Sequence, residues 1–199
     1  MKKIAVILLA LLFIPREAFA AVPLIDYLRE HYYGTVQDGK FVYKWCGYDF
    51  DLADWTYDLY ANSAEAQSQN NIDLTNLTTL LTAKSRDNTQ VVSISVCDFS
   101  DIYSNVSLNI SDLKQLAANS ESTLVESFQN KGVRVISREI KEREFLGREA
   151  ALLQIIIEQD ARLYVSRILM MTGGTLHMFD IYCPTVKDFE RILARFSLQ

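Results

Sequence analysis

The chain has 199 residues and a formal net charge of −5 at pH 7, with 20 Lys and Arg against 25 Asp and Glu. This acidic balance argues against nucleic acid or anionic lipid as the main partner. The length suits one domain with its own hydrophobic core.

The first twenty residues have the pattern of a secretory signal peptide. Two lysines precede the apolar run 4–14, which is too short to span a bilayer. Pro15 then breaks the helix, and small residues end at Ala20, where we expect cleavage. The pattern predicts a bacterial periplasmic or secreted protein, with a signal peptide at 1–20, a single domain at 21–199 and no stable membrane anchor after cleavage.

The three cysteines cannot all pair within the chain. Export favours disulfides, and of the three possible bridges we favour Cys46–Cys97, with Cys183 left as a thiol. The alternative is that all three are buried thiols that act as small hydrophobes. No Cys or His spacing typical of a metal or redox site is present, so we expect no metal and no cofactor.

The first half of the mature chain combines short elements with polar loops. Residues 23–33 read as a short amphipathic helix, and residues 62–71 as an exposed loop. Between them Tyr48, Phe50 and Leu52 alternate with acidic residues, which is typical of half-buried strands. The next elements are two strands at 77–83 and 91–96, joined as a hairpin by a turn at 86–88.

A long helix is predicted at 111–131, with Ser111 as its N-cap and Gly132 after its last turn. Apolar residues form one stripe along it, namely Leu113, Leu116, Ala117, Leu124, Val125 and Phe128. A strand at 133–140 follows, and then a charged turn that closes at Leu146-Gly147.

Three antiparallel strands are predicted next, at 149–158, 162–171 and 175–182. Gly173-Gly174 suits a two-residue hairpin turn in which both residues have positive φ. Such a turn places Arg167 opposite Asp180, as a structural ion pair that contributes a few tenths of a kcal/mol to about 1 kcal/mol.

The middle strand of these three has apolar residues on both sides, so both faces of the sheet need a cover. A last helix is predicted at 186–196, with Thr185 as its cap and Phe196 on its buried stripe. The expected fold is therefore α+β, an antiparallel sheet covered by helices on both faces in a helix–sheet–helix sandwich.

The order of elements in the second half resembles the PsbP-like superfamily. The resemblance rests on the segments GVRVISREIKEREFLGREAALLQIII, RLYVSRILMMTGGTLHMFDIYCP and ERILARFSL, which follow the long helix. That superfamily includes the extrinsic subunit of the plant oxygen-evolving complex, a nuclear import factor that binds Ran, and bacterial exported proteins. The resemblance implies a module that binds protein partners or assists assembly, and not an enzyme.

Aromatic residues are concentrated near the start of the mature chain. Seven of the ten tyrosines and both tryptophans lie between residues 27 and 60. Aromatic side chains with a polar group are common at interfaces. The residues expected to bind a partner or ligand are Tyr43, Trp45, Tyr48, Trp55 and Tyr57. The alternatives are that they line a small-molecule or peptide pocket between sheet and helix, or that they fill the edge of the core.

Catalytic patterns are sparse. Ser111 and Lys114 have the Ser-x-x-Lys spacing, but a helix cap with a solvated lysine explains them better. His31 and His177 are expected to be partly exposed, and Cys183 lies too far along the strand to pair with His177. The acidic residues Asp49, Asp51, Asp54 and Asp58 read as a solvated face. We therefore expect a non-enzymatic exported module with an unknown protein partner, and a hydrolase is the least favoured alternative.

Overall fold

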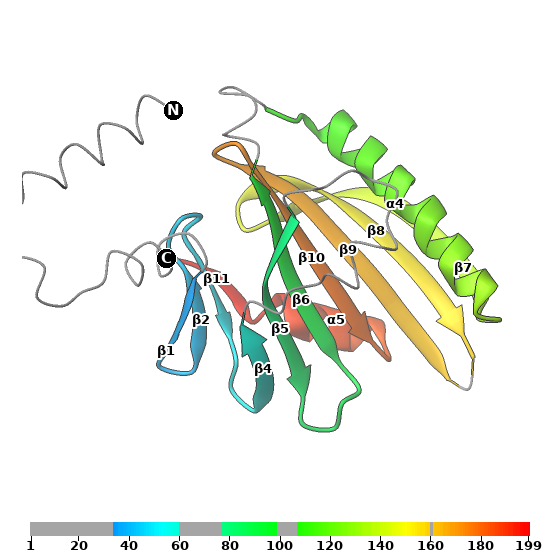
Figure 1. Cartoon of the computed structure of the whole chain (residues 1–199), viewed down its shortest axis with the longest axis horizontal. Helices are drawn as coiled ribbons and strands as arrows, with labels where there is room; N and C mark the ends of the chain where they lie inside the picture. Colours follow the sequence, from blue (N-terminus) through cyan, green and yellow to red (C-terminus); the bar gives the residue numbers. More distant parts are fainter. Residues whose placement is uncertain (1–33, 60–76, 99–106, 160) are drawn as a thin grey trace, which may run out of the picture.

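The computed structural model describes residues 34–59, 77–98, 107–159 and 161–199 (Figure 1). The predicted signal peptide, the helix at 23–33 with His31, and the loop at 62–71 lie outside these residues. Within the described residues, no helix has both the length and the apolar character that crossing a membrane requires.

The larger of two sheets is antiparallel throughout and forms the middle layer. From edge to edge its seven strands are β4 (Trp55–Leu59), β5 (Leu77–Ser85), β6 (Val91–Asp98), β10 (Thr175–Cys183), β9 (Arg162–Thr172), β8 (Arg148–Glu158) and β7 (Arg134–Phe145). The predicted hairpin of β5 and β6 and the three-strand meander of β8, β9 and β10 are confirmed.

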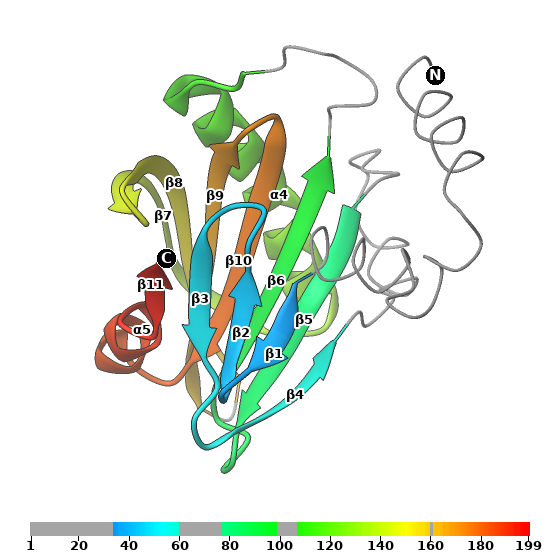
Figure 2. The ribbon, with the colours of Figure 1, turned by 90° about the vertical axis from the view of Figure 1, so that its left-hand side faces the viewer.

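The expected helix–sheet–helix sandwich is wrong. One face of the large sheet is covered by a helix, α4 (Ile110–Asn130), but the other carries a second sheet together with the short helix α5 (Val186–Leu193) (Figure 2). The second sheet has the order β1 (Thr35–Gln37), β2 (Lys40–Tyr43), β3 (Tyr48–Asp51) and β11 (Phe196–Leu198).

The second sheet arises because its strands alternate between apolar and polar residues. Phe41, Tyr43, Tyr48 and Phe50 are buried on the side that faces the large sheet. A sheet with one apolar face is stable when that face packs on another apolar layer, and here the large sheet provides it. The alternation of these strands was predicted correctly, but the layer on which their apolar face packs was not.

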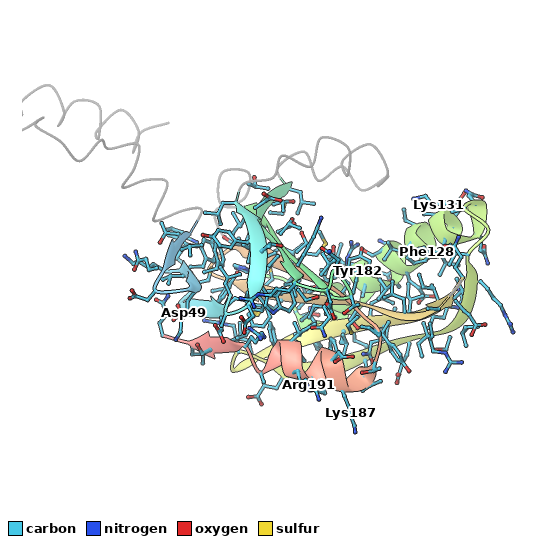
Figure 3. All side chains as sticks on the ribbon, turned by 90° about the horizontal axis from the view of Figure 1, so that it is seen from below. Asp49, Phe128, Lys131, Tyr182, Lys187 and Arg191 are labelled. Carbon is cyan, nitrogen blue, oxygen red and sulfur yellow. The ribbon has the colours of Figure 1, made fainter. Side chains whose placement is uncertain are left out.

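Apolar residues on both sides of β9 belong to two separate cores, as its alternation predicted. Val165 and Leu169 pack in the cluster under α4. Ile168 and Met170 pack in the cluster between the large sheet, the small sheet and α5. Phe128 of α4 packs against the first of these clusters, whereas Lys187 points away from the protein on the outer side of α5 (Figure 3).

Three element boundaries differ from the prediction. The N-cap of α4 is Asn109 and not Ser111. The side chain of Asn109 accepts hydrogen bonds from the backbone N–H groups of Ser111 and Asp112. The predicted charged turn at 141–145 is the second half of β7, an edge strand whose charges face water and which therefore lacks clear apolar alternation. The last helix ends at Leu193, and Phe196 begins a strand that pairs with β3.

The hairpin of β9 and β10 is as predicted. Gly173 and Gly174 have φ of +57° and +86°, which suits glycine best. Arg167 lies opposite Asp180 and donates two hydrogen bonds to its carboxylate, at 2.7 and 2.9 Å. Burial opposes the charge on Arg167, but the carboxylate of Asp180 offsets this, so the pKa of Arg167 is raised. The pair is largely buried, and the loss of one partner is therefore expected to cost more than the contribution of about 1 kcal/mol or less that was predicted for the pair.

Candidate functional site

Several turns gather at one end of the molecule (Figures 1 and 2). The turn 44–47 joins β2 to β3 and is closed by hydrogen bonds from the N–H groups of Cys46 and Gly47 to the carbonyl of Tyr43. Trp45 in this turn is 38% exposed. The C-terminus lies beside it, because Leu198 pairs with Tyr48 and the N–H of Gln199 donates to the carbonyl of Gly47 at 2.9 Å.

The turn between β7 and β8 lies next to the C-terminal residues. Leu146 and Gly147 both have positive φ there, of +51° and +67°. A Cβ added to Gly147 would lie 3.6 Å from Cδ1 of Leu198, so the two residues are neighbours. We call the surface made by residues 44–47, 107–110, 146–149 and 198–199 the turn end.

Two adjoining open hollows, of about 320 and 360 Å³, lie at the start of α4 on this surface. They share four lining residues, Ile110, Gly147, Arg148 and Glu149. The hollow of about 320 Å³ is lined mainly by charged residues and that of about 360 Å³ mainly by uncharged ones, and neither contains the aromatic residues predicted to line a pocket. The predicted aromatic pocket between sheet and helix is therefore not the hollow found here.

Beneath the turn end lies a cysteine–histidine pair. Sγ of Cys46 is 3.0 Å from Nε2 of His177, although the two residues are 131 positions apart. The His177 ring is 0% exposed and lies against Tyr43, Tyr48 and Phe179, with centroid distances of 5.9 to 6.2 Å. The prediction of a partly exposed His177 is wrong, because β10 is a central strand and the small sheet covers this face.

The surroundings of this pair keep the imidazole neutral. Burial, with a smaller effect from the positive charge of Arg148, lowers the pKa of His177 to about 4. Burial also raises the pKa of Tyr48 well above its usual value, with further contributions from Tyr43 and Cys46. Nδ1 of His177 and the Tyr48 hydroxyl are buried and have no hydrogen-bond partner in the described part of the chain. A neutral His177 does not provide the imidazolium that activates the cysteine of thiol hydrolases.

The five aromatic residues predicted as a binding surface are not together. Tyr43 and Tyr48 are 2% and 0% exposed and belong to the core, so their assignment to a partner surface is wrong. Trp55 packs edge-on against Phe50 and is only partly exposed. Trp45 and Tyr57 are exposed, but Trp45 lies in the turn before β3, whereas Tyr57 lies in β4 of the large sheet and outside the turn end.

The predicted Cys46–Cys97 disulfide is also wrong. Cys46 packs on the face of the large sheet that bears the small sheet, and Cys97 packs on the α4 face. The three cysteines form no disulfide with one another. Cys183 is fully buried, and burial raises the pKa of its thiol to about 11, with a further contribution from Asp188.

The remaining candidates from the sequence have structural roles. Lys114 forms a salt bridge with Glu142 at 3.0 Å, and Asp54 forms one with Arg86 at 2.8 Å. In the four described segments, no three His, Cys, Asp or Glu side chains converge to hold a metal ion. The Cys46–His177 pair was not predicted, because the two residues are 131 positions apart and no local pattern in the sequence brings them together.

No protein-family model matches the sequence. No curated protein matches it either. Among solved structures, the cyanobacterial PsbP (CyanoP) of Synechocystis sp. PCC 6803 is similar, with a TM-score of 0.53 and 13% identity over 83% of this chain and 96% of that chain. A protein from Bacteroides thetaiotaomicron has a TM-score of 0.47 and 10% identity, over 82% of this chain and 49% of that chain. The similarity to CyanoP concerns the fold, and the chain has a PsbP-like fold.

Proposed function

We propose that this protein is an exported, non-enzymatic binding or assembly module, and that it docks a protein partner through the turn end. The observation that carries the proposal is the exposure of two large apolar side chains, Trp45 and Leu198, at this end. They are 38% and 59% exposed, and the turn of Trp45 is joined to the C-terminus by the hydrogen bond from Gln199. Tryptophan is among the residues that contribute most to protein interfaces.

The charges around the hollows favour a basic contact on the partner. Arg143 donates two hydrogen bonds to Glu190, which satisfies its charge. Among the described residues, Glu144 and Glu149 form no salt bridge and line the hollow of about 320 Å³; Arg148, which lines both hollows, forms none either, so one negative charge is left in excess. The chain as a whole is acidic. A partner with Lys or Arg beside an apolar pocket therefore suits this surface.

The non-enzymatic part of the proposal is supported by the state of the two thiol candidates. His177 is neutral at pH 7, and the Cys183 thiol is buried with a raised pKa. Neither Cys46, whose partner His177 is neutral, nor Cys183 therefore has the imidazolium partner that thiol hydrolases use. Export is supported by the signal-peptide pattern of the first twenty residues. N-terminal sequencing of the protein from a cell envelope fraction is expected to start at Ala21, and a chain that keeps its first residues would contradict export.

Affinity capture with matched baits tests the docking surface. The wild-type mature chain is compared with a Trp45→Ser/Leu198→Ser variant, and Tyr57→Ser serves as control because Tyr57 is an exposed aromatic residue outside the turn end. The double variant is expected to capture the partner at least about tenfold less, whereas the control captures it normally. Equal capture by all three baits, or loss with the control alone, would place the interface elsewhere.

The alternative is that the two hollows bind a short peptide or small molecule. Their volumes of about 320 and 360 Å³ are within the range of ligand sites. Under this alternative, a Glu149→Gln/Arg148→Gln variant loses binding to a small ligand, while the Trp45→Ser/Leu198→Ser variant retains it. A screen of short peptides by calorimetry separates the two functions.

A further inference from the structure

The three cysteines differ in their access to solvent. Cys97 and Cys183 are 2% and 0% exposed, whereas Cys46 is partly exposed in the turn that carries Trp45. A reagent in solution therefore reaches Cys46 before it reaches the other two. Accessibility alone does not distinguish a reactive thiol from an inert one, so the surroundings of the sulfur decide.

The partner of Cys46 can stabilise either protonation state of the sulfur. With a proton on sulfur, the thiol donates to Nε2 of the neutral His177 at 3.0 Å. With the proton on Nε2, the imidazole donates to a thiolate instead. In that second state, Nδ1 is a buried acceptor rather than a buried donor.

A second observation is that two buried polar atoms at this site have no hydrogen-bond partner among the described residues. These atoms are the hydroxyl of Tyr48 and Nδ1 of His177. The two rings are 5.9 Å apart between centroids. Unsatisfied buried polar groups are uncommon, and a redox or catalytic role is one of the explanations for them.

We propose that Cys46 is a site of reversible thiol modification, at which a small molecule containing a disulfide forms a mixed disulfide with the protein. The Cys46 thiolate attacks one sulfur of the disulfide, a new S–S bond forms and the original S–S bond breaks. The leaving thiolate takes up the proton that Cys46 released, so atoms and electrons balance. His177 is a positioning residue, which donates to the Cys46 thiolate through Nε2.

Modification of this sulfur affects the core beneath it. A sulfur that bears a second sulfur no longer keeps its 3.0 Å hydrogen bond with His177, so both ring nitrogens of His177 are then buried without a partner. The modified protein is therefore expected to be less stable than the unmodified protein, and reduction restores its stability.

Thiol counting with a chromogenic aromatic disulfide tests the site. The folded wild-type chain is expected to react with one equivalent of reagent, and the denatured chain with all three cysteines. Cys46→Ser removes the reaction of the folded chain, and Cys183→Ser, the matched control, leaves it unchanged. Peptide mapping by mass spectrometry is expected to find the adduct on Cys46. No reaction of the folded chain, or reaction first at Cys97 or Cys183, would overturn the proposal.

The role of His177 is tested by the pH profile of the same reaction. His177→Phe removes the donor, and its rate at pH 7 is expected to fall about tenfold, with the profile shifted to higher pH. His177→Gln retains an N–H donor, and its rate is expected to lie between those of the wild type and His177→Phe. Circular dichroism establishes that each variant is folded. Identical rates and profiles for all three proteins would remove His177 from the proposal, and the thiol count of the wild-type chain tests Cys46 even if both variants fail to fold.

Discussion

The buried His177 makes the stability of the protein depend on pH. In the folded state its pKa is lowered from 6.5 to about 4 by burial and by the charge of Arg148. Between these two values the unfolded chain binds a proton at this residue and the folded chain does not. Stability is therefore complete above about pH 6.5 and falls as the pH is lowered towards 4.

The size of this effect follows from the difference between the two pKa values. One pKa unit corresponds to about 1.4 kcal/mol, so the interval from 6.5 to about 4 corresponds to about 3 kcal/mol. This is a large fraction of the 5–15 kcal/mol, roughly, that holds a typical domain folded. Carboxylates titrate mainly at the lower end of the same range, so the wild type alone does not isolate the histidine.

The contribution of His177 is isolated by comparing the wild type with His177→Phe. Both proteins are unfolded with urea at a series of pH values between 7 and 4. Carboxylates and His31 are present in both proteins, and their contributions cancel in the difference between the two free energies of unfolding. The wild type is expected to lose about 3 kcal/mol more than the variant over this range. Parallel pH dependence in the two proteins would refute the assignment of a buried, neutral His177.

Three further changes test the packing. Asp180→Ala leaves the nearly buried charge of Arg167 without its partner and is expected to cost about 3–5 kcal/mol in urea unfolding, whereas replacing both residues by leucine recovers most of this loss; a cost below about 1 kcal/mol would mean that the pair is solvated. Asn109→Ala is expected to lower the free energy of unfolding by about 1 kcal/mol, while Ser111→Ala changes it little, and the reverse order would restore Ser111 as the cap. Phe196→Ala is expected to cost about 3–5 kcal/mol in thermal or urea unfolding, because this ring packs on three other aromatic residues within 5.4 Å between centroids, and a negligible cost would show that β11 is not part of the core.

Features that depend on neighbouring residues could be predicted from the sequence. Gly173-Gly174 allows only a tight turn between two apolar runs, and this sets the register that brings Arg167 opposite Asp180. The apolar stripe of α4 is likewise a local repeat, although the cap was misplaced by two residues because Asn109 and Ser111 both have the side chain that a cap requires.

Only part of the candidate site could be predicted from the sequence. Alternation shows that Tyr48 and Phe50 face one side of a strand, but it does not show whether that side meets solvent, a partner or another sheet. The aromatic residues were therefore assigned to a binding surface as a group. In the structure Tyr43 and Tyr48 are part of the core, whereas Trp45 is exposed because it lies in a turn.

The local elements, and the need to cover both faces of the large sheet, follow from patterns in the sequence. That a small sheet and α5 cover the second face, and that the last residues of the chain form a strand beside β3, follows from long-range packing. The same packing brings Cys46 to within 3.0 Å of His177 across 131 positions. The reason is that a periodic pattern specifies which side of an element is apolar, whereas the element that meets that side is selected by packing between distant parts of the chain.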